Sequence, residues 1–390
     1  MKLSDYIAQF LSKITDSVFV GQGGNIIHLL DSLGKRKDIN VIPSQNEQAA
    51  SIAADAYSRF NSKIGVTAAT SGPGMLNLMQ GMACSFFDSI PTFHFSGAVV
   101  TGQLRKNKNI RQIGFQEMEV VDLVKPITKY AVLLKDKNMI KYELEKMLYY
   151  AKEGRPGPVL MDLPDDLQRA DINPKKLKGF KPTNIKFKKE KFEKKFISIL
   201  NKSKKPIIIL GHGINLSKTK DEVRKFISKT GIPFLPSWAT VDIFPFNHKL
   251  NAGTFGVAAT RYGNFAIQNS DLIISLGCRL NTQITGSNIK SFAPKAKKII
   301  IDIDSNEFKK NNGLKIDLKI NLDLKIFFKR INSYLKTKKN YNEWIDNFKN
   351  WKIKYPIIKQ SYYNQVKNVN PYVFMKKLSD KTTKKDILIP

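Results

Sequence analysis

The stretch Ile64-Gly65-Val66-Thr67-Ala68-Ala69-Thr70-Ser71-Gly72-Pro73-Gly74 carries the pattern that decides the fold of this chain. Its first seven residues are mainly small, apolar or β-branched, which predicts a buried strand. A turn rich in glycine and proline ends the strand, and the apolar spacing after it predicts a helix over 75–87. A buried strand that passes through a tight turn into a helix is the repeating unit of a parallel α/β layer.

The same alternation of strands and helices extends outward over residues 1–170 and returns after a lysine-rich stretch. The predicted strands lie at 18–20, 40–43, 64–70, 91–96, 158–163, 206–210, 271–277 and 298–304. We therefore expect an α/β protein of two successive doubly wound parallel-sheet domains, with the start of a third. The predicted boundaries are 1–170 for the first domain, 171–205 for a lysine-rich linker, 206–340 for the second domain and 341–390 for the rest. A further strand is expected at 386–390.

Composition excludes several classes of protein. The 390 residues are 42% hydrophobic, and the formal net charge of +32 comes mainly from lysines spread along the chain. Arginine, the better reader of bases and phosphates, is sparse, so no nucleic-acid partner is expected. No apolar run approaches the roughly 18 residues of a membrane span, and the first residues do not read as a signal peptide. We expect a cytoplasmic protein without a membrane partner.

Cysteine and histidine usage points away from a metal centre built by this chain. Cys84 and Cys278 lie far apart in apolar surroundings, and the four histidines are scattered. Neither a disulfide framework nor a set of metal ligands is expected.

Candidate chemistry gathers at the carboxyl ends of the first domain's predicted strands. Glu47 opens a helix of small and apolar residues, expected to be mostly buried, and is a candidate acid or base. Taken alone, such a residue is more often a solvated glutamate favoured by the helix dipole. Because parallel strands end at one edge of a sheet, Glu47 should lie near the loop 21–25, the turn 71–74 with Asn77, and residues 115–117. Together these segments predict a site for a flat heterocycle.

Spaced motifs resemble the thiamine-diphosphate enzymes, and most closely the large (catalytic) subunits of acetolactate synthases. The resemblance covers essentially the whole chain, because several motifs occur in the family's order. They are Gly-x-Gly-Gly at 21–24, Asn-Glu-Gln-Ala-Ala at 46–50, Thr-Ser-Gly-Pro-Gly-x-x-Asn at 70–77, Phe-Gln-Glu at 115–117, Gly-Arg-Pro-Gly-Pro-Val at 154–159, and middle-domain patterns at 264–272, 277–279 and 285–286.

The resemblance implies a role for each matching residue of the first, pyrimidine-binding domain. Glu47 would hydrogen-bond N1′ of the aminopyrimidine and so activate the cofactor, which attacks a 2-oxo acid such as pyruvate. Carbon dioxide leaves and the product adds to a second carbonyl. Pro73 and Asn77 would line the pyrimidine pocket. Gly24 and Gln116 would face the reacting carbonyl, and Phe115 and Lys129 would lie at the substrate entrance.

The second, Rossmann-like middle domain resembles the part of these enzymes that holds a flavin. The positions that match are Gly211, Gly213, Gly277, Arg279 and Asp302, so FAD is a possible second cofactor. The region 254–258 lacks the family's usual Met and His. The resemblance also implies a homodimer or homotetramer, with a regulatory subunit as a further possible partner.

Two departures from the family pattern bear on function. Gln283 stands where acetolactate synthases carry an arginine that helps to select the second oxo acid. An amide cannot offer the bidentate contact that a guanidinium gives a carboxylate, so the acceptor substrate could differ. In addition, no Gly-Asp-Gly motif occurs in 1–390, whereas the family's third domain uses one to hold Mg²⁺ and the diphosphate. We expect a partner subunit's domain to hold these groups, and the chain alone to bind the cofactor poorly and to be inactive.

Several alternatives stay open from the sequence. The chain could be a truncated copy or one half of a split enzyme; truncation is favoured because a split within a strand leaves unpaired sheet edges. It could be a binding or regulatory module that kept the fold without catalysis, or a thiamine-diphosphate lyase with another substrate. A nicotinamide-dependent dehydrogenase built on the second domain is disfavoured, because the complete glycine fingerprint is absent.

Overall fold

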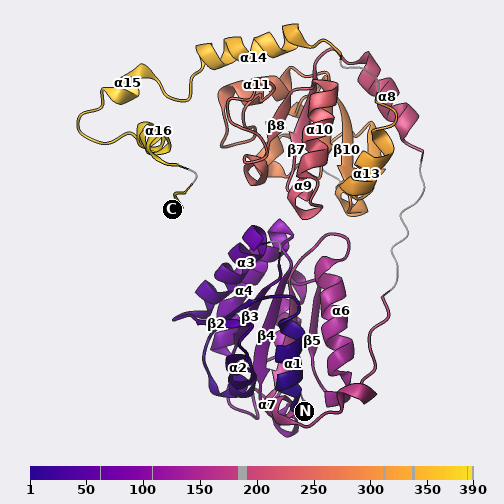
Figure 1. Ribbon diagram of the computed structural model, residues 1–390, viewed down its shortest axis with the longest axis vertical. Helices are drawn as coiled ribbons and strands as arrows, with labels where there is room; N and C mark the ends of the chain where they lie inside the picture. The colour runs from indigo at the N-terminus through magenta and orange to yellow at the C-terminus, as the bar shows by residue number, and fades with distance from the viewer. Residues whose placement is uncertain are drawn as a thin grey trace. The chain divides into compact units, whose positions relative to one another are not determined.

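The computed structural model describes residues 1–61, 63–107, 109–182, 191–310, 313–335, 339–383 and 385–388. The chain forms two compact units, Met1–Ile185 and Lys186–Pro390 (Figure 1). Each unit is built on its own sheet, and every strand pair in both sheets is parallel. The prediction of two successive parallel α/β units is therefore confirmed.

The first unit is a six-stranded sheet in the order β2-β1-β3-β4-β6-β5 between two layers of helices. One core cluster packs α1, α2 and α6 against the sheet, and a smaller one packs α4 and α5 on the other face beside α3. Its elements are α1 (Leu3–Leu11), β1 (Ser17–Val20), α2 (Ile27–Gly34), β2 (Asn40–Pro43), α3 (Glu47–Asn61), β3 (Gly65–Ala69), α4 (Pro73–Asp88), β4 (Thr92–Ala98), α5 (Val120–Val124), β5 (Tyr130–Leu133), α6 (Ile140–Lys152), β6 (Val159–Pro164) and α7 (Asp165–Arg169).

The stretch 64–74 forms β3, its turn and the start of α4. All five residues of β3 are buried, and the strand pairs with β1 and β4 on its two sides. Gly65 lets α3 lie directly on the strand, because a Cβ there would be 1.9 Å from the carbonyl oxygen of Ala54. Gly72 has a φ of 62°, a conformation that glycine adopts without strain, and Pro73 then begins α4.

The second unit is a five-stranded sheet in the order β11-β10-β9-β7-β8. Phenylalanines of α8, α10 and α13 contact one another in its core, while α14 packs on α11. Its elements are α8 (Glu193–Lys202), β7 (Pro206–Leu210), α9 (Gly213–Leu216), α10 (Lys220–Thr230), β8 (Phe234–Pro236), α11 (Arg261–Gln268), β9 (Leu272–Leu276), α12 (Thr282–Thr285), β10 (Lys297–Asp302), β11 (Leu318–Asn321), α13 (Leu324–Ile331), α14 (Asn342–Lys354), α15 (Gln360–Tyr363) and α16 (Pro371–Lys381).

Two expectations outside the sheets need correction. The stretch 171–205 is not a linker throughout, because α8 lies within it and buries Phe196 in the core of the second unit. Lysines between apolar residues at helical spacing hid this amphipathic helix. Residues 386–388 are not in a strand, since they pair with no strand among the described residues, and the rest of that predicted strand lies outside them.

No helix in the described ranges combines the length and the apolar character that crossing a membrane requires.

Candidate functional site

Glu47 lies at the carboxyl edge of the first sheet, as the first residue of α3 after β2. Asn77, one turn into α4, donates a hydrogen bond from Nδ2 to Glu47 Oε2 over 2.9 Å. Glycine backbones make room for this carboxylate: a Cβ at Gly21 would lie 2.3 Å from Glu47 Cγ, and one at Gly74 would lie 3.3 Å from Oε1. Three separate segments of the sequence, the loop at 21, the start of α3 and the start of α4, thus meet at one carboxylate.

The helix that carries Glu47 is less buried than expected. The side chain of Glu47 is half-buried, and α3 buries only the face that packs on the sheet and on α4. On the opposite face Ile52 is 43% exposed and Phe60 is 89% exposed. The expectation of a mostly buried helix is wrong because small residues and alanines also suit a helix surface that is open on one side.

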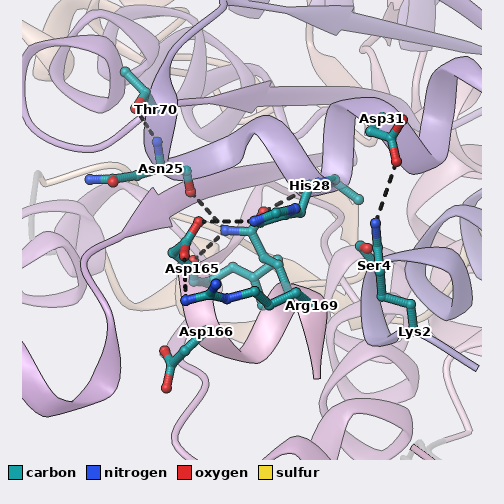
Figure 2. Close-up of polar contacts among 12 residues, drawn as sticks. Lys2, Ser4, Asn25, His28, Asp31, Thr70, Asp165, Asp166 and Arg169 are labelled. Atoms are coloured by element: carbon teal, nitrogen blue, oxygen red, sulfur yellow. Dashed lines mark hydrogen bonds and ion pairs between the residues drawn. The ribbon is translucent and has the colours of Figure 1, made fainter. Parts of the chain in front are cut away.

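The loop between β1 and α2 is fastened to the turn after β3. A Cβ at Gly23 would collide with the side chain of Thr70, whereas one at Gly24 would meet nothing within 4 Å. Asn25 donates from its backbone N to Thr70 Oγ1 (3.3 Å), as Figure 2 shows, and from Nδ2 to Ser71 Oγ (2.6 Å). The backbone at Gly24 is therefore both held in place and open to a ligand.

A second loop brings Gln116 against the same turn. Gln116 has a φ of 59°, and a Cβ at Gly72 would lie 2.8 Å from the Gln116 Cβ. The preceding Phe115 is 76% exposed. A positive φ on a residue with a side chain costs energy and persists only where the surroundings impose it. The structure thus brings Gln116, Pro73 and Asn77 to the edge that holds Glu47.

Lys129 lies elsewhere in the first unit. It precedes β5, so it is at the amino edge of the sheet, opposite the edge at which Glu47 lies. Its Nζ donates to the carbonyl oxygen of Glu153 at 2.5 Å. Within this unit Lys129 thus lies away from Glu47, and its place at a substrate entrance stays a prediction. The sequence analysis predicted no strand at 130–133, so it did not show that Lys129 precedes one.

His94 of β4 and Asp162 of β6 are two buried ionisable side chains on the face of the sheet that α4 and α5 cover. Burial lowers the pKa of His94 to about 3, and the ring bonds Thr67 Oγ1 through Nδ1 and Thr92 Oγ1 through Nε2. Burial also raises the pKa of Asp162 to about 7, although Ser96 Oγ donates to its Oδ1 at 2.6 Å. Asp162 was not singled out from the sequence, because a lone Asp in an apolar strand resembles an exposed strand end.

Glycines of the second unit lie where its strands end, but they pack on one another. A Cβ at Gly211 would be 2.2 Å from the carbonyl oxygen of Gly277, and one at Gly213 would be 2.8 Å from the Gly277 Cα. These residues let two strand–helix turns touch, which explains them without a ligand. Arg279 follows Gly277 closely in the same turn, and Asp302 ends the neighbouring strand β10.

Gln283 lies in α12 with an exposed side chain, and its backbone oxygen accepts from Val257 N at 2.9 Å.

Asn25 was not singled out from the sequence as a site residue. Its signal is its place at a helix start directly after three glycines of the motif at 21–24.

Among the described residues, no three side chains of the His, Cys, Asp or Glu type are grouped so as to hold a metal ion.

Comparison with known proteins places this geometry in a family. Residues 1–123 match the family model described as "Thiamine pyrophosphate enzyme, N-terminal TPP binding domain", and residues 194–331 match "Thiamine pyrophosphate enzyme, central domain". The first match contains Glu47, Asn77 and Gln116.

Similar curated proteins carry the name acetolactate synthase. The chain is 32% identical to acetolactate synthase 2, chloroplastic, of Nicotiana tabacum, over 91% of this chain and 54% of the relative. It is 35% identical to a probable acetolactate synthase large subunit of Methanococcus aeolicus, over 83% and 55%. It is 32% identical to the acetolactate synthase large subunit of Lactococcus lactis subsp. lactis, over 99% and 66%. The chain spans about half the length of the first relatives it matches. It belongs to the thiamine pyrophosphate enzymes and contains their N-terminal and central domains.

Proposed function

We propose that this chain carries the cofactor-activating part of a thiamine-diphosphate enzyme. The enzyme would decarboxylate a 2-oxo acid, with pyruvate as the first candidate, and join the product to a second carbonyl in the manner of acetolactate synthases. The observation that carries the proposal is the Glu47 carboxylate, which Asn77 holds at 2.9 Å against the glycine backbones at 21 and 74.

The residues present fit thiamine diphosphate. Glu47 would accept a hydrogen bond at N1′ of the aminopyrimidine, and the Asn77 bond orients the carboxylate for that contact. When bound, the cofactor supplies the nucleophilic carbon that decarboxylation of a 2-oxo acid requires. Gly24 offers open backbone to the reacting carbonyl, Gln116 faces the same turn, and Phe115 is exposed at the entrance.

A Glu47→Gln variant tests the proposal. Glutamine keeps the shape of the side chain but cannot take up and release a proton. In the protein completed with a diphosphate-binding domain, turnover of pyruvate with thiamine diphosphate and Mg²⁺ should therefore fall by about 10²–10⁴-fold. The control is Asp38→Asn, which makes the same change of charge at an exposed ion pair with Arg36 in the same unit. Undiminished turnover in Glu47→Gln, with the control also active, would remove Glu47 from the chemistry.

The identity of the second carbonyl depends on Gln283. Because an amide binds a carboxylate less strongly than a guanidinium does, we propose that a second pyruvate is a poor acceptor for this enzyme. A Gln283→Arg variant should then raise the yield of acetolactate from pyruvate. A yield unchanged by this variant would argue that position 283 does not select the acceptor.

We also propose that Mg²⁺ accompanies the diphosphate and that a partner subunit's domain holds both; the family resemblance alone supports this. FAD in the second unit is a further proposal with weaker support, because packing between turns already explains Gly211, Gly213 and Gly277. Visible absorbance and flavin fluorescence of the purified protein test it directly.

A homodimer or homotetramer is supported by the exposed face of α3 and α4. Beside Ile52 and Phe60, this face exposes Leu76 and Phe87 on the two helices that carry Glu47 and Asn77. Apolar side chains gathered on adjacent helices are typical of an interface. Light scattering should find an oligomer for the wild type and a smaller species for Phe60→Glu. A regulatory subunit is a further possible partner, since two of the relatives are named large subunits.

A further inference from the structure

The short helix α7 follows β6 and contacts both loops that carry the open backbone at Gly24 and the side chain of Gln116. Its Asp165 lies close to His28 of α2, with 3.5 Å between Nε2 and Oδ1; the exposed Arg169, on α7 itself, lies 3.6 Å from Oδ2. Figure 2 shows His28, Asp165 and Arg169 together, with Asn25 and Thr70 beside them. The helix is thus fixed to α2 from behind the site.

Gln168 of α7 is fully buried and makes three hydrogen bonds to the backbone of three segments. Its Nε2 donates to the carbonyl oxygen of Asn25 (2.7 Å) and to that of Leu163 (3.1 Å), while its Oε1 accepts from Leu29 N (3.2 Å). A buried amide with both donors and its acceptor used fixes the groups it bonds. Asn25 therefore bonds α7 through its carbonyl and the turn after β3 through its amide nitrogens.

Asp166 of α7 holds the start of the second loop. Its carboxylate accepts from Thr101 N (2.9 Å) and from Thr101 Oγ1 (2.6 Å). Four residues later, Arg105 N donates to Glu117 Oε1 (2.5 Å), and Ile113 N donates to Glu117 Oε2 (2.9 Å). Asp166 is thus connected, through the chain from Thr101 to Arg105 and its hydrogen bond, to Glu117, the residue next to Gln116.

We propose that α7 is a brace that sets the position of Gly24 relative to Gln116, with Gln168 and Asp166 as its positioning residues. The proposal rests on the proposed function, which places Gly24 and Gln116 at the reacting carbonyl. Neither positioning residue reaches the substrate. Each acts through one backbone segment, and a displacement of about 1 Å at a reacting centre can lower the rate about 10²-fold.

The test compares Gln168→Glu and Asp166→Asn with the control Arg169→Gln in the full-length protein. Glutamate keeps the acceptor for Leu29 N but removes both donors, so the bond to the Asn25 carbonyl is lost. Asparagine keeps one oxygen for Thr101 and serves as the milder variant if the buried glutamate prevents folding. Arg169→Gln removes only the exposed partner of Asp165 on the same helix.

Two readouts separate positioning from folding. Hydrogen exchange without cofactor should become about tenfold faster at residues 25–29 in Gln168→Glu and at 101–105 in Asp166→Asn, and stay unchanged in the control. Turnover with pyruvate, thiamine diphosphate and Mg²⁺, assayed with a diphosphate-binding domain supplied, should show kcat lower by about 10–100-fold, with the KM for the 2-oxo acid within about threefold of the wild type.

Each outcome decides a different point. Exchange at wild-type rates in both variants would overturn the brace. Faster exchange with an unchanged kcat would refute the positioning role, because the loops would then be loosened without effect on the reaction. Faster exchange in a protein whose wild type shows no turnover, even with a diphosphate-binding domain supplied, would leave the brace standing and refute the proposed function.

Discussion

Asp162→Asn should make the first unit more stable at neutral pH than the wild type. Asp162 is buried in β6, receives one hydrogen bond from Ser96 Oγ and lies near the charge of Glu119. Burial, opposed by the Ser96 bond and assisted by Glu119, raises its pKa from 3.8 to about 7. Asparagine keeps an oxygen that can accept from Ser96 but has no proton to lose.

The direction and the size of this difference in stability follow from proton binding by Asp162. Between pH 3.8 and about 7 the unfolded chain has lost the Asp162 proton, whereas the folded chain keeps it. The folded state then binds more protons, so the free energy of unfolding falls as the pH rises through this range. Each pKa unit corresponds to about 1.4 kcal/mol, so the whole difference is about 4 kcal/mol. The variant should gain this amount over the wild type between pH 4 and pH 8.

Urea denaturation of both proteins at a series of pH values measures the effect. Far-UV circular dichroism follows both units, while the chain's three tryptophans, Trp238, Trp344 and Trp351, all lie in the second unit. Tryptophan fluorescence therefore serves as an internal control that should not differ between the two proteins. A difference in unfolding free energy that stays constant from pH 4 to pH 8 would refute the reasoning.

Three further results are expected. His94→Gln should remove an opposite dependence: burial lowers the pKa of His94 from 6.5 to about 3, so wild-type stability falls as the pH drops through that range, and urea melts of the variant should lack this loss. Gly81→Ala should destabilise the first unit by about 1–3 kcal/mol, because its Cβ would lie 2.5 Å from the backbone of Ser51 in α3; an unchanged thermal midpoint would contradict this. Gly34→Ala, where a Cβ meets nothing within 4 Å, should instead stabilise α2 by about 0.5–1 kcal/mol in the same assay.

Strand positions and the edge at which chemistry collects could be predicted from the sequence. The buried run at 65–69 and its neighbours are short, apolar and bounded by glycine or proline, so local pattern and tertiary packing agree. The family motifs then brought Glu47, Asn77 and Gln116 together correctly, because each follows a strand in the same direction.

The remaining features depend on packing that no local pattern encodes. Gln168 reads as an ordinary polar residue of a short helix, yet it is fully buried because the stretch 25–29, distant in the sequence, and the end of β6 converge on it. Lys129 lies next to a strand, as the residues around Glu47 do, and only the pairing of β5 with β6 shows that it lies at the other edge of the sheet. Phe196 shows the same limit, since lysine content concealed the core face of α8.

Because the two glycine turns of the second unit contact each other, the presence of these glycines in a related sequence does not indicate that it binds a flavin. A protein of this family that has lost its flavin would still need Gly211, Gly213 and Gly277, because any side chain there would drive β7 and β9 apart at their ends. Their presence is thus inherited with the fold and has no power to separate flavin-carrying from flavin-free members. Gly286, where a Cβ would meet nothing within 4 Å, has a φ of 78°, a backbone conformation that by itself favours glycine, so it does not separate them either.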